Sequence, residues 1–183
     1  MKIVHFHRIL IMLIVAVISF SCSSDLDFNQ ATDLKLQPVF ISNLAYFDIP
    51  ANRFVTTGVE QSVIVDSPTV DVFNDAFFSN HLTRADLSFE INNTIDRAYT
   101  LEIVLRDKNN QPLYSINFNI PAYNGTENLV TKSEIFENAK LDLLKSTTRM
   151  TFVIRMLSGA PLNENSLGSI KLRSGVTAYL IVQ

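Results

Sequence analysis

The sequence predicts a mainly β protein: an antiparallel β-sandwich of immunoglobulin-like or jelly-roll type, with about eight or nine strands and two short helices. Two observations support this. Apolar and polar residues alternate along much of the chain after residue 37, as they do in strands that bury one face. Residues typical of turns (Gly, Pro, Asn and Asp) separate these segments at short intervals. A closed barrel with a lid helix is the second possibility.

The amino-terminal segment has the pattern of a secretory signal. Residues 9–20 are an apolar run, preceded by Lys2 and Arg8 and followed by a small residue at Ser21. A membrane-spanning helix needs about 20 consecutive apolar residues. Residues 1–21 are therefore predicted to be a signal peptide, and a membrane anchor made by the helix itself is the weaker alternative.

The only cysteine, Cys22, directly follows this segment. The run that ends Ser19-Phe20-Ser21-Cys22 resembles the lipobox of bacterial lipoproteins, in which signal peptidase II cleaves before a lipid-modified cysteine. Ser19 departs from the pattern, because the family usually has Leu there. The resemblance implies that Cys22 carries acyl chains such as palmitate and anchors the protein to the membrane, with each buried CH₂ adding about 0.8 kcal/mol. It also implies a place in the bacterial cell envelope, at the outer membrane, on the periplasmic or the surface face.

Residues 22–37 are polar and are predicted to form a lipidated tether. Ser23-Ser24-Asp25-Leu26-Asp27 resembles the surface-export signals of lipoproteins from Bacteroidota, although Leu26 interrupts the usual acidic pair. A simple solvated tether is the alternative. Residues 38–183 are then a single domain, since this length favours one core.

Composition excludes several kinds of partner. Once Lys2 and Arg8 are removed with the signal, thirteen basic and eighteen acidic residues remain, a net charge of −5. No basic cluster longer than a pair occurs, so nucleic acid is not an expected partner. With Cys22 used by the anchor, the domain has neither disulfides nor a thiolate metal site, and its stability must come from packing.

The first half of the domain is expected to contain strands and one helix. A strand over 38–49, broken at Ser42-Asn43 in one interpretation, ends at Pro50, and two further strands cover 54–57 and 59–65. Apolar residues at helical spacing then predict a helix over 70–82 that Asp71 caps.

The clearest signal is a hairpin. After a strand over 87–92, apolar and polar residues alternate along 101–106 and 114–120, and the turn sequence 107–112 joins them. One face of this hairpin is polar, as expected in an antiparallel sheet with one solvated side.

The last third is expected to contain the second helix. A loop turns at Asn124-Gly125, and Thr131 and Glu134 then have the spacing of a capping box before an apolar stripe that reaches residue 146. Strands are expected over 149–157, 169–173 and 176–182, with a turn at Ser174-Gly175 between the last two.

No catalytic constellation is visible, and we expect no enzyme activity and no cofactor. His81 is the only histidine after the signal, and no nucleophile-elbow, zinc or phosphate-loop motif occurs. His81 is expected to be a surface or capping residue. Residues 107–111 have the opening rhythm of a calcium loop, but Pro112 and Phe118 occupy positions that need Gly and Glu. Asp71 and Asp75 form a carboxylate pair at helical spacing, with nothing nearby to separate their pKa values.

Sugar binding remains open through exposed tyrosines, since tryptophan is absent. Strand alternation explains Tyr123, in the loop after residue 120, least well, so Tyr123 is the candidate ligand-binding residue. The first functional hypothesis is a lipid-anchored, non-catalytic interaction or assembly module with protein partners in the envelope. The alternative is a module that binds glycans or other nutrients. The sequence leaves the oligomeric state open.

Overall fold

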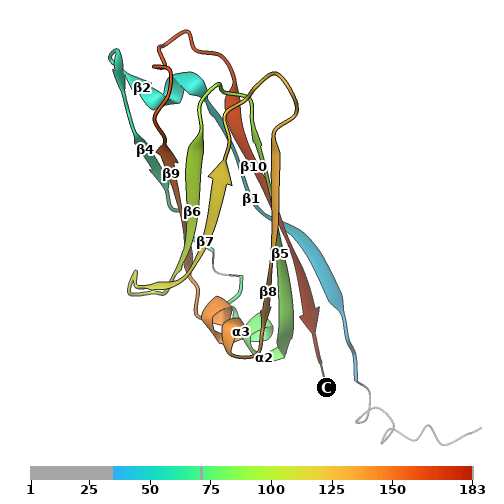
Figure 1. The fold of residues 1–183 in the computed structure, drawn as a ribbon. Coiled ribbons are helices and arrows are strands. Elements are labelled where there is room, and N and C mark those ends of the chain that lie inside the picture. Colours follow the sequence, from blue (N-terminus) through green and yellow to red (C-terminus); the bar gives the residue numbers. More distant parts are fainter. Residues whose placement is uncertain (1–34, 71, 183) are drawn as a thin grey trace, which may run out of the picture. The chain divides into compact units, whose positions relative to one another are not determined.

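The computed structural model describes residues 35–70 and 72–182. Cys22, the predicted signal and nearly all of the tether lie outside this part, as does Asp71. Two four-stranded antiparallel sheets face each other (Figure 1). The strands of the first sheet are, in spatial order, β1 (Val39–Pro50), β10 (Ser169–Leu180), β5 (Leu82–Asn93) and β8 (Leu129–Glu137). Those of the second are β4 (Val63–Asp66), β9 (Arg149–Met156), β6 (Tyr99–Arg106) and β7 (Pro112–Ile120).

The strand pairing is that of a jelly roll. Among the strands of the two large sheets, the first pairs with the last and so on inwards: β1 with β10, β4 with β9, β5 with β8, and β6 with β7. This nested order arises when one long hairpin rolls up into two sheets, which selects the jelly roll from the two topologies that the sequence left open. The remaining elements are connections: the 3₁₀ turn η2 (Ala51–Phe54), β2 (Val55–Thr56), β3 (Val59–Glu60), α2 (Ala76–His81) and α3 (Asn138–Lys145).

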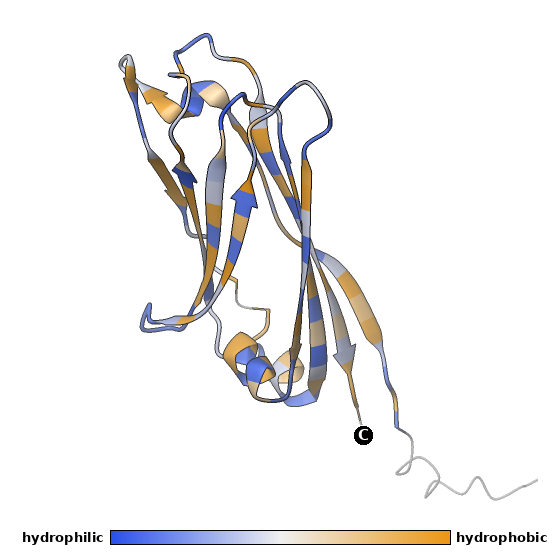
Figure 2. Cartoon of the chain, in the orientation of Figure 1, coloured by the Kyte–Doolittle hydropathy of each residue, from blue (hydrophilic) through white to orange (hydrophobic). Residues whose placement is uncertain are grey.

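Alternate residues of both sheets form one core between them. Phe89 of β5 meets Phe118 of β7 with ring centroids 5.7 Å apart, and Phe47 of β1 meets Phe152 of β9 at 5.9 Å. Figure 2 shows the resulting alternation of hydrophobic and hydrophilic bands along the strands. Inward apolar side chains at every second position explain why the sequence pattern predicted the fold class.

The second helix was predicted to begin near residue 134, and this predicted start is wrong. Thr131 and Glu134 lie in β8, which pairs with β5 along its whole length, and the helix begins only at Asn138. The continuous ladder and the burial of Phe136 against the core outweigh the local capping signal, since tertiary packing overrides propensity.

The helix expected over 70–82 is also much shorter than predicted. Only Ala76–His81 is helical, and its cap is Asp75, whose carboxylate accepts a hydrogen bond from the Phe77 amide at 2.9 Å. Val70 instead donates its amide to the Thr148 carbonyl at 2.9 Å, and Phe73 is buried in the core. The phenylalanines at helical spacing therefore serve two different local structures.

The turn expected at Ser174-Gly175 does not occur, because β10 runs straight through it. The irregularity lies in the neighbouring strand, where the register of β1 shifts between Asn43 and Ala45. The Ser174 hydroxyl accepts a hydrogen bond from the Ala45 amide at 2.8 Å and donates one to the Ala45 carbonyl at 2.9 Å. Although Ser174-Gly175 is typical of a turn, the pair therefore lies within the long strand β10, opposite a β-bulge in β1.

Candidate functional site

The outer face of the first sheet carries a hollow that crosses all four strands. The pairing aligns side chains in rows across the sheet, and three of these rows are Ile41–Thr177–Asp86–Ile135, Asn43–Gly175–Ser88–Ser133 and Tyr46–Arg173–Glu90–Thr131. The middle row consists of a glycine and short polar side chains. A hollow of about 540 Å³ lies over this row, and we call it the Gly175 hollow.

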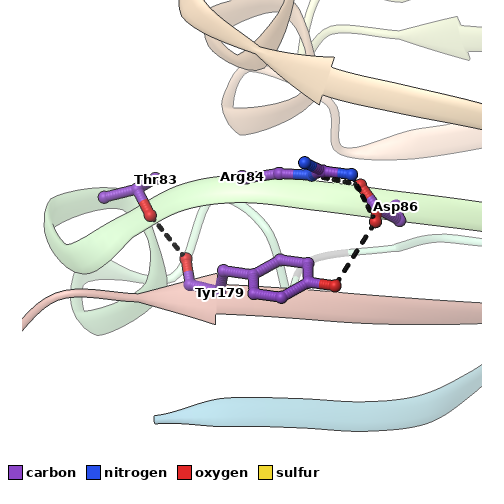
Figure 3. A network of polar contacts seen from close by, with 4 residues as sticks. All are labelled: Thr83, Arg84, Asp86 and Tyr179. Atoms are coloured by element: carbon purple, nitrogen blue, oxygen red, sulfur yellow. Dashed lines mark hydrogen bonds and ion pairs between the residues drawn. The ribbon is translucent and has the colours of Figure 1, made fainter. Parts of the chain in front are cut away.

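Most charges near this hollow are already paired. Figure 3 shows Arg84 and Asp86, whose charged groups lie 2.7 Å apart, with the Tyr179 hydroxyl 3.5 Å from the Asp86 carboxylate. The hydrogen bond to Asp86 raises the pKa of Arg84. At the other end of the face, Lys171 lies 3.2 Å from Asp48.

Arg173 and Glu90 differ from these pairs. They lie opposite each other in the register of β10 and β5, and both side chains are exposed. Within the described residues, neither takes part in an ion pair. Two smaller hollows, of about 170 and 240 Å³, also border Arg173, one beside Asn92 and one beside Tyr46. Arg173 therefore borders three hollows, and among the described residues its guanidinium group has no hydrogen-bond or ion-pair partner.

The second candidate surface is the free edge of β1. In the described part of the chain β1 pairs only with β10, so one side of its backbone faces away from the sheet. Ile41 is 81% exposed, and Val39 and Phe40 are about half exposed. Figure 2 shows the hydrophobic bands on this strand.

Two apolar pockets of about 330 Å³ each lie along the inward side of β1. The first, the Phe40 pocket, is lined by Phe40, Leu44, Val70, Phe73, Phe78 and neighbouring residues. The second, the Phe47 pocket, lies between β1 and β4 and is lined by Phe47, Ile49, Ile64, Val65, Phe152 and neighbouring residues. We call the free backbone of β1 together with these pockets the β1 edge.

The opposite edge of the same sheet, at β8, carries charged side chains at inward positions, although Leu129 and Ile135 are exposed. Glu134 accepts hydrogen bonds from Lys140 of α3 at 2.6 Å and from the Tyr114 hydroxyl of β7 at 3.1 Å. Lys132 lies 3.6 Å from the same carboxylate. Burial raises the pKa of Glu134, but the hydrogen bonds and the two lysine charges outweigh burial and hold the pKa below its usual value.

The residues that the sequence singled out do not come together. Tyr123 is half-buried on the loop between β7 and β8, where its amide donates to the Ile95 carbonyl at 2.9 Å, and it lines none of the hollows described above. His81 donates from Nδ1 to the Phe77 carbonyl at 2.8 Å, so it closes the end of α2, as expected for a capping histidine. The role of Tyr123 stays a prediction, as does the lipidation of Cys22.

The expected hairpin turn is confirmed where a calcium loop was considered. The Asp107 carboxylate accepts hydrogen bonds from the amides of Asn109 and Gln111 at 2.9 and 2.8 Å, and Asn110 has a φ of 63°. The acidic group is thus used by the turn itself. Across residues 35–70 and 72–182, no group of three His, Cys, Asp or Glu side chains is arranged to hold a metal ion.

The buried Arg97, which lies between β5 and β6, has a structural role. Arg97 is only 7% exposed and donates to the carbonyls of Leu157 and Ala160, while Glu60 lies 3.7 Å away. Glu60 also accepts the Leu162 amide at 2.6 Å. These groups fasten the loop after β9, and none of them faces an open hollow described above.

No family model matches the chain, and no curated protein matches it either. The solved structures that resemble it include the VP2 subviral particle of infectious bursal disease virus, at 12% identity and a TM-score of 0.44, covering 78% of this chain and 32% of that one. A protein from Parabacteroides distasonis matches at 15% identity and a TM-score of 0.44, covering 63% of this chain and 37% of that one.

A third similar structure is the enzymatically active domain of bacteriophage CBA120 tailspike protein 4, at 14% identity and a TM-score of 0.37. It covers 80% of this chain and 19% of that one. The chain thus spans about a third of the length of the first two matches, and these distant likenesses carry no functional argument. The class of the protein, a jelly-roll β-sandwich, rests on its own strand order.

Sequence reasoning missed Arg173, Glu90 and Gly175. The alternation did place Glu90 on the outer side of a strand, but only the pairing of β10 with β5 puts Arg173 beside it. Gly175 was interpreted as part of a turn because Ser-Gly favours turns locally. If residues 169–180 had been interpreted as one uninterrupted strand, Arg173 and Gly175 would have been placed on the same face of that strand.

Proposed function

We propose that this protein is a non-catalytic interaction module of the bacterial envelope, held by lipid at Cys22, that binds extended peptide segments by strand addition to β1. The observation that carries the proposal is the β1 edge: a free strand backbone flanked by two apolar pockets. Strand addition uses main-chain hydrogen bonds for affinity and pockets at alternate positions for specificity. Both requirements are present on one strand.

The geometry fixes the length of the partner segment. Strand residues advance about 3.3 Å each, so the nine steps from Phe40 to Ile49 span about 30 Å. A partner of about ten residues would reach both pockets, with apolar side chains at alternate positions. Arg53 and Asp66 both border the Phe47 pocket, so the rim has no strong preference for one sign of charge.

The contrast with other strands supports this reading of β1. Proteins that avoid edge pairing use short edges, proline, or charges that point inward. β4 has only four residues, β7 begins with Pro112, and β8 carries Lys132 and Glu134. β1 has twelve residues, ends at Pro50 and has a register shift between Asn43 and Ala45, but no charged side chain of β1 points inward, since its single one, Asp48, is paired with Lys171.

A displayed library of random ten-residue peptides, selected on the full-length protein in detergent, tests the proposal. We expect the selected peptides to alternate apolar and polar residues. Phe40→Lys and Val65→Lys, one at each pocket, should each weaken the best peptide at least tenfold, because a buried unpaired charge is costly. The matched control is Ile135→Lys on β8, since Ile135 and Phe40 are 46% and 47% exposed. Equal binding by all three variants, or selected peptides without alternation, would refute strand addition.

The anchor is tested separately. We expect the full-length protein to incorporate labelled palmitate in its native host and to partition with membranes, and Cys22→Ala to abolish both. Unchanged labelling of the variant would refute the lipoprotein assignment while leaving the β1 proposal intact. In the part of the chain that the structure describes, no helix is long and apolar enough to cross a membrane.

A further inference from the structure

We propose that the Gly175 hollow binds a neutral saccharide, at a site distinct from the β1 edge. The hollow lies on the outer face of the sheet and is centred on β10 and β5, whereas the β1 edge opens towards β4 and α2. Asn43 borders both the hollow and the Phe40 pocket, and Tyr46, beside the hollow, also belongs to β1. One ligand can therefore be lost without the other.

The hollow exists because of Gly175. The backbone there is extended, and a Cβ atom would lie 3.3 Å from the Ser88 hydroxyl and 3.4 Å from the Ser42 carbonyl. Any larger side chain would project into the space above the sheet. Since Ser88 and Ser133 follow the glycine in the same row, the floor is low across β10, β5 and β8.

The rim offers both kinds of hydrogen-bonding partner. Arg173 has only donors, an ionised Glu90 has only acceptors, and the amide and hydroxyls of Asn43, Ser88 and Ser133 have both. Saccharide hydroxyls donate and accept at once, so they can satisfy Glu90 and Arg173 together. Lys132 also lines the hollow, but its ammonium group lies 3.6 Å from Glu134 and donates to the Asn117 carbonyl of β7. Arg173 and Glu90 are therefore the two charges left for a ligand, and together they favour neither an anion nor a cation.

Tyr46 supplies the apolar surface that a sugar ring needs. It lies beside Arg173 in the register of β1 and β10, is 63% exposed, and borders the smaller hollow that Arg173 shares. A tyrosine ring offers a large, rigid face at low entropic cost, which suits the C–H face of a pyranose. An open, polar groove of this kind fits a chain of sugars better than it fits a compact apolar ligand.

Arg173 and Glu90 differ from the other oppositely charged residues on this face, because in the described chain they form no ion pair. Arg84–Asp86 and Lys171–Asp48, on the same face, do form ion pairs. Arg173 and Glu90 are directly opposite, yet no contact within 4.0 Å joins their charges in the described chain. The guanidinium group of Arg173 and the carboxylate of Glu90 are therefore separate from each other, and both side chains are exposed beside a hollow, where they could bind a polar ligand.

Calorimetric titration of the full-length protein in detergent tests the proposal. The probes are five neutral hexasaccharides (cellohexaose, xylohexaose, mannohexaose, laminarihexaose and maltohexaose), with hexagalacturonate as the acidic comparator. We expect at least one neutral probe to bind, with hexagalacturonate at least tenfold weaker. Gly175→Thr, which fills the floor, and Tyr46→Ala should each weaken the best probe at least tenfold.

Matched controls separate the site from the rest of the protein. Glu90→Gln should weaken binding severalfold, whereas Glu137→Gln, on the same face but outside the hollow, should leave it unchanged. Tyr123→Ala should also leave it unchanged. Failure of all five neutral probes, preference for hexagalacturonate, or loss of binding in Tyr123→Ala with retention in Tyr46→Ala would overturn the proposal. A cooperative thermal unfolding transition like that of the parent protein shows that Gly175→Thr is folded, so a loss of saccharide binding can be interpreted whether or not the β1 edge binds peptide.

Discussion

The two edge strands of the first sheet, β1 and β8, differ in how well their side chains protect them from pairing with a further strand. β8 places Lys132 and Glu134 among inward positions, where the Glu134 carboxylate contacts Lys132, Lys140 and the Tyr114 hydroxyl. β1 places apolar residues there, beside two open pockets. One edge is closed by side chains of the molecule itself, and the other is left with unused backbone groups and unfilled apolar space.

The open edge at β1 is therefore not a general consequence of the fold, because β8 is an edge strand of the same sheet and is protected. An inward charge makes it costly for another strand to add, because the charge would lose its partners or its water. The jelly roll thus carries that protection at β8 and lacks it at β1, where strand addition would bury apolar surface.

The largest expected effect comes from paired truncations in the two edges. Phe136→Ala should lower the free energy of unfolding by about 3–5 kcal/mol, because Phe136 is fully buried and the change leaves a cavity. Phe40→Ala should cost only about 1 kcal/mol, because Phe40 is 47% exposed. Urea denaturation of both variants measures this, and equal losses would contradict the view that β1 is the open edge.

A smaller effect should follow from loosening the bulge that holds β1. Ser174→Ala removes the hydroxyl that bonds the amide and the carbonyl of Ala45, and should cost about 1–3 kcal/mol because both groups lose a partner. Hydrogen exchange should quicken at Ala45 more than at residues of β8. Ser133→Ala, in an exposed position of β8, is the control and should change little. A uniform rise in exchange would show that the hydroxyl acts on the whole sheet.

The polar closure of β8 should itself contribute to stability. Glu134→Gln removes the charge paired with Lys140 and should cost about 1–2 kcal/mol at pH 7. Asp48→Asn, in the exposed pair of β1, should cost about 0.5 kcal/mol or less. Chemical denaturation of both variants provides the comparison, and a larger loss in Asp48→Asn would reverse the ranking of the two edges.

The same carboxylate should make stability depend on pH. Because the pKa of Glu134 is lower in the folded protein than its ordinary value of 4.5, its contribution is complete above pH 4.5. It is lost as the pH falls through the lower folded-state value. Glu134→Gln should therefore lose less stability than the parent protein between pH 5 and pH 3, as measured by thermal unfolding. Parallel pH curves would show that Glu134 gains nothing from its partners.

The smallest stability effects should come from charges added to the outer side of each edge. Ile41→Lys and Ile135→Lys should each change the free energy of unfolding by about 0.5 kcal/mol or less, because both side chains are exposed. Only Ile41→Lys should alter the peptide affinity measured at the β1 edge. Equal affinities in the two variants would confine the proposed contact to the inward side of β1.

The hairpin of β6 and β7 shows what local pattern can predict. Alternation, a turn sequence and one polar face predicted both strands and their partner, because each of these signals lies within about 20 residues. The capping-box signal at Thr131 failed for the opposite reason. Local spacing there favours a helix, but pairing with β5, nearly 50 residues earlier in the chain, decides for a strand.

The features of the candidate surfaces also divide into those that local sequence pattern predicts and those that depend on pairing between distant strands. Alternation by itself determined which face of each strand is polar, and composition determined that packing without disulfides must hold the domain together. Which strands became edges, and therefore that β1 is open while β8 is closed, was decided only by tertiary structure. So was the meeting of Arg173, Glu90 and Gly175. Each of these depends on register between strands far apart in sequence, which the sequence of one strand does not encode.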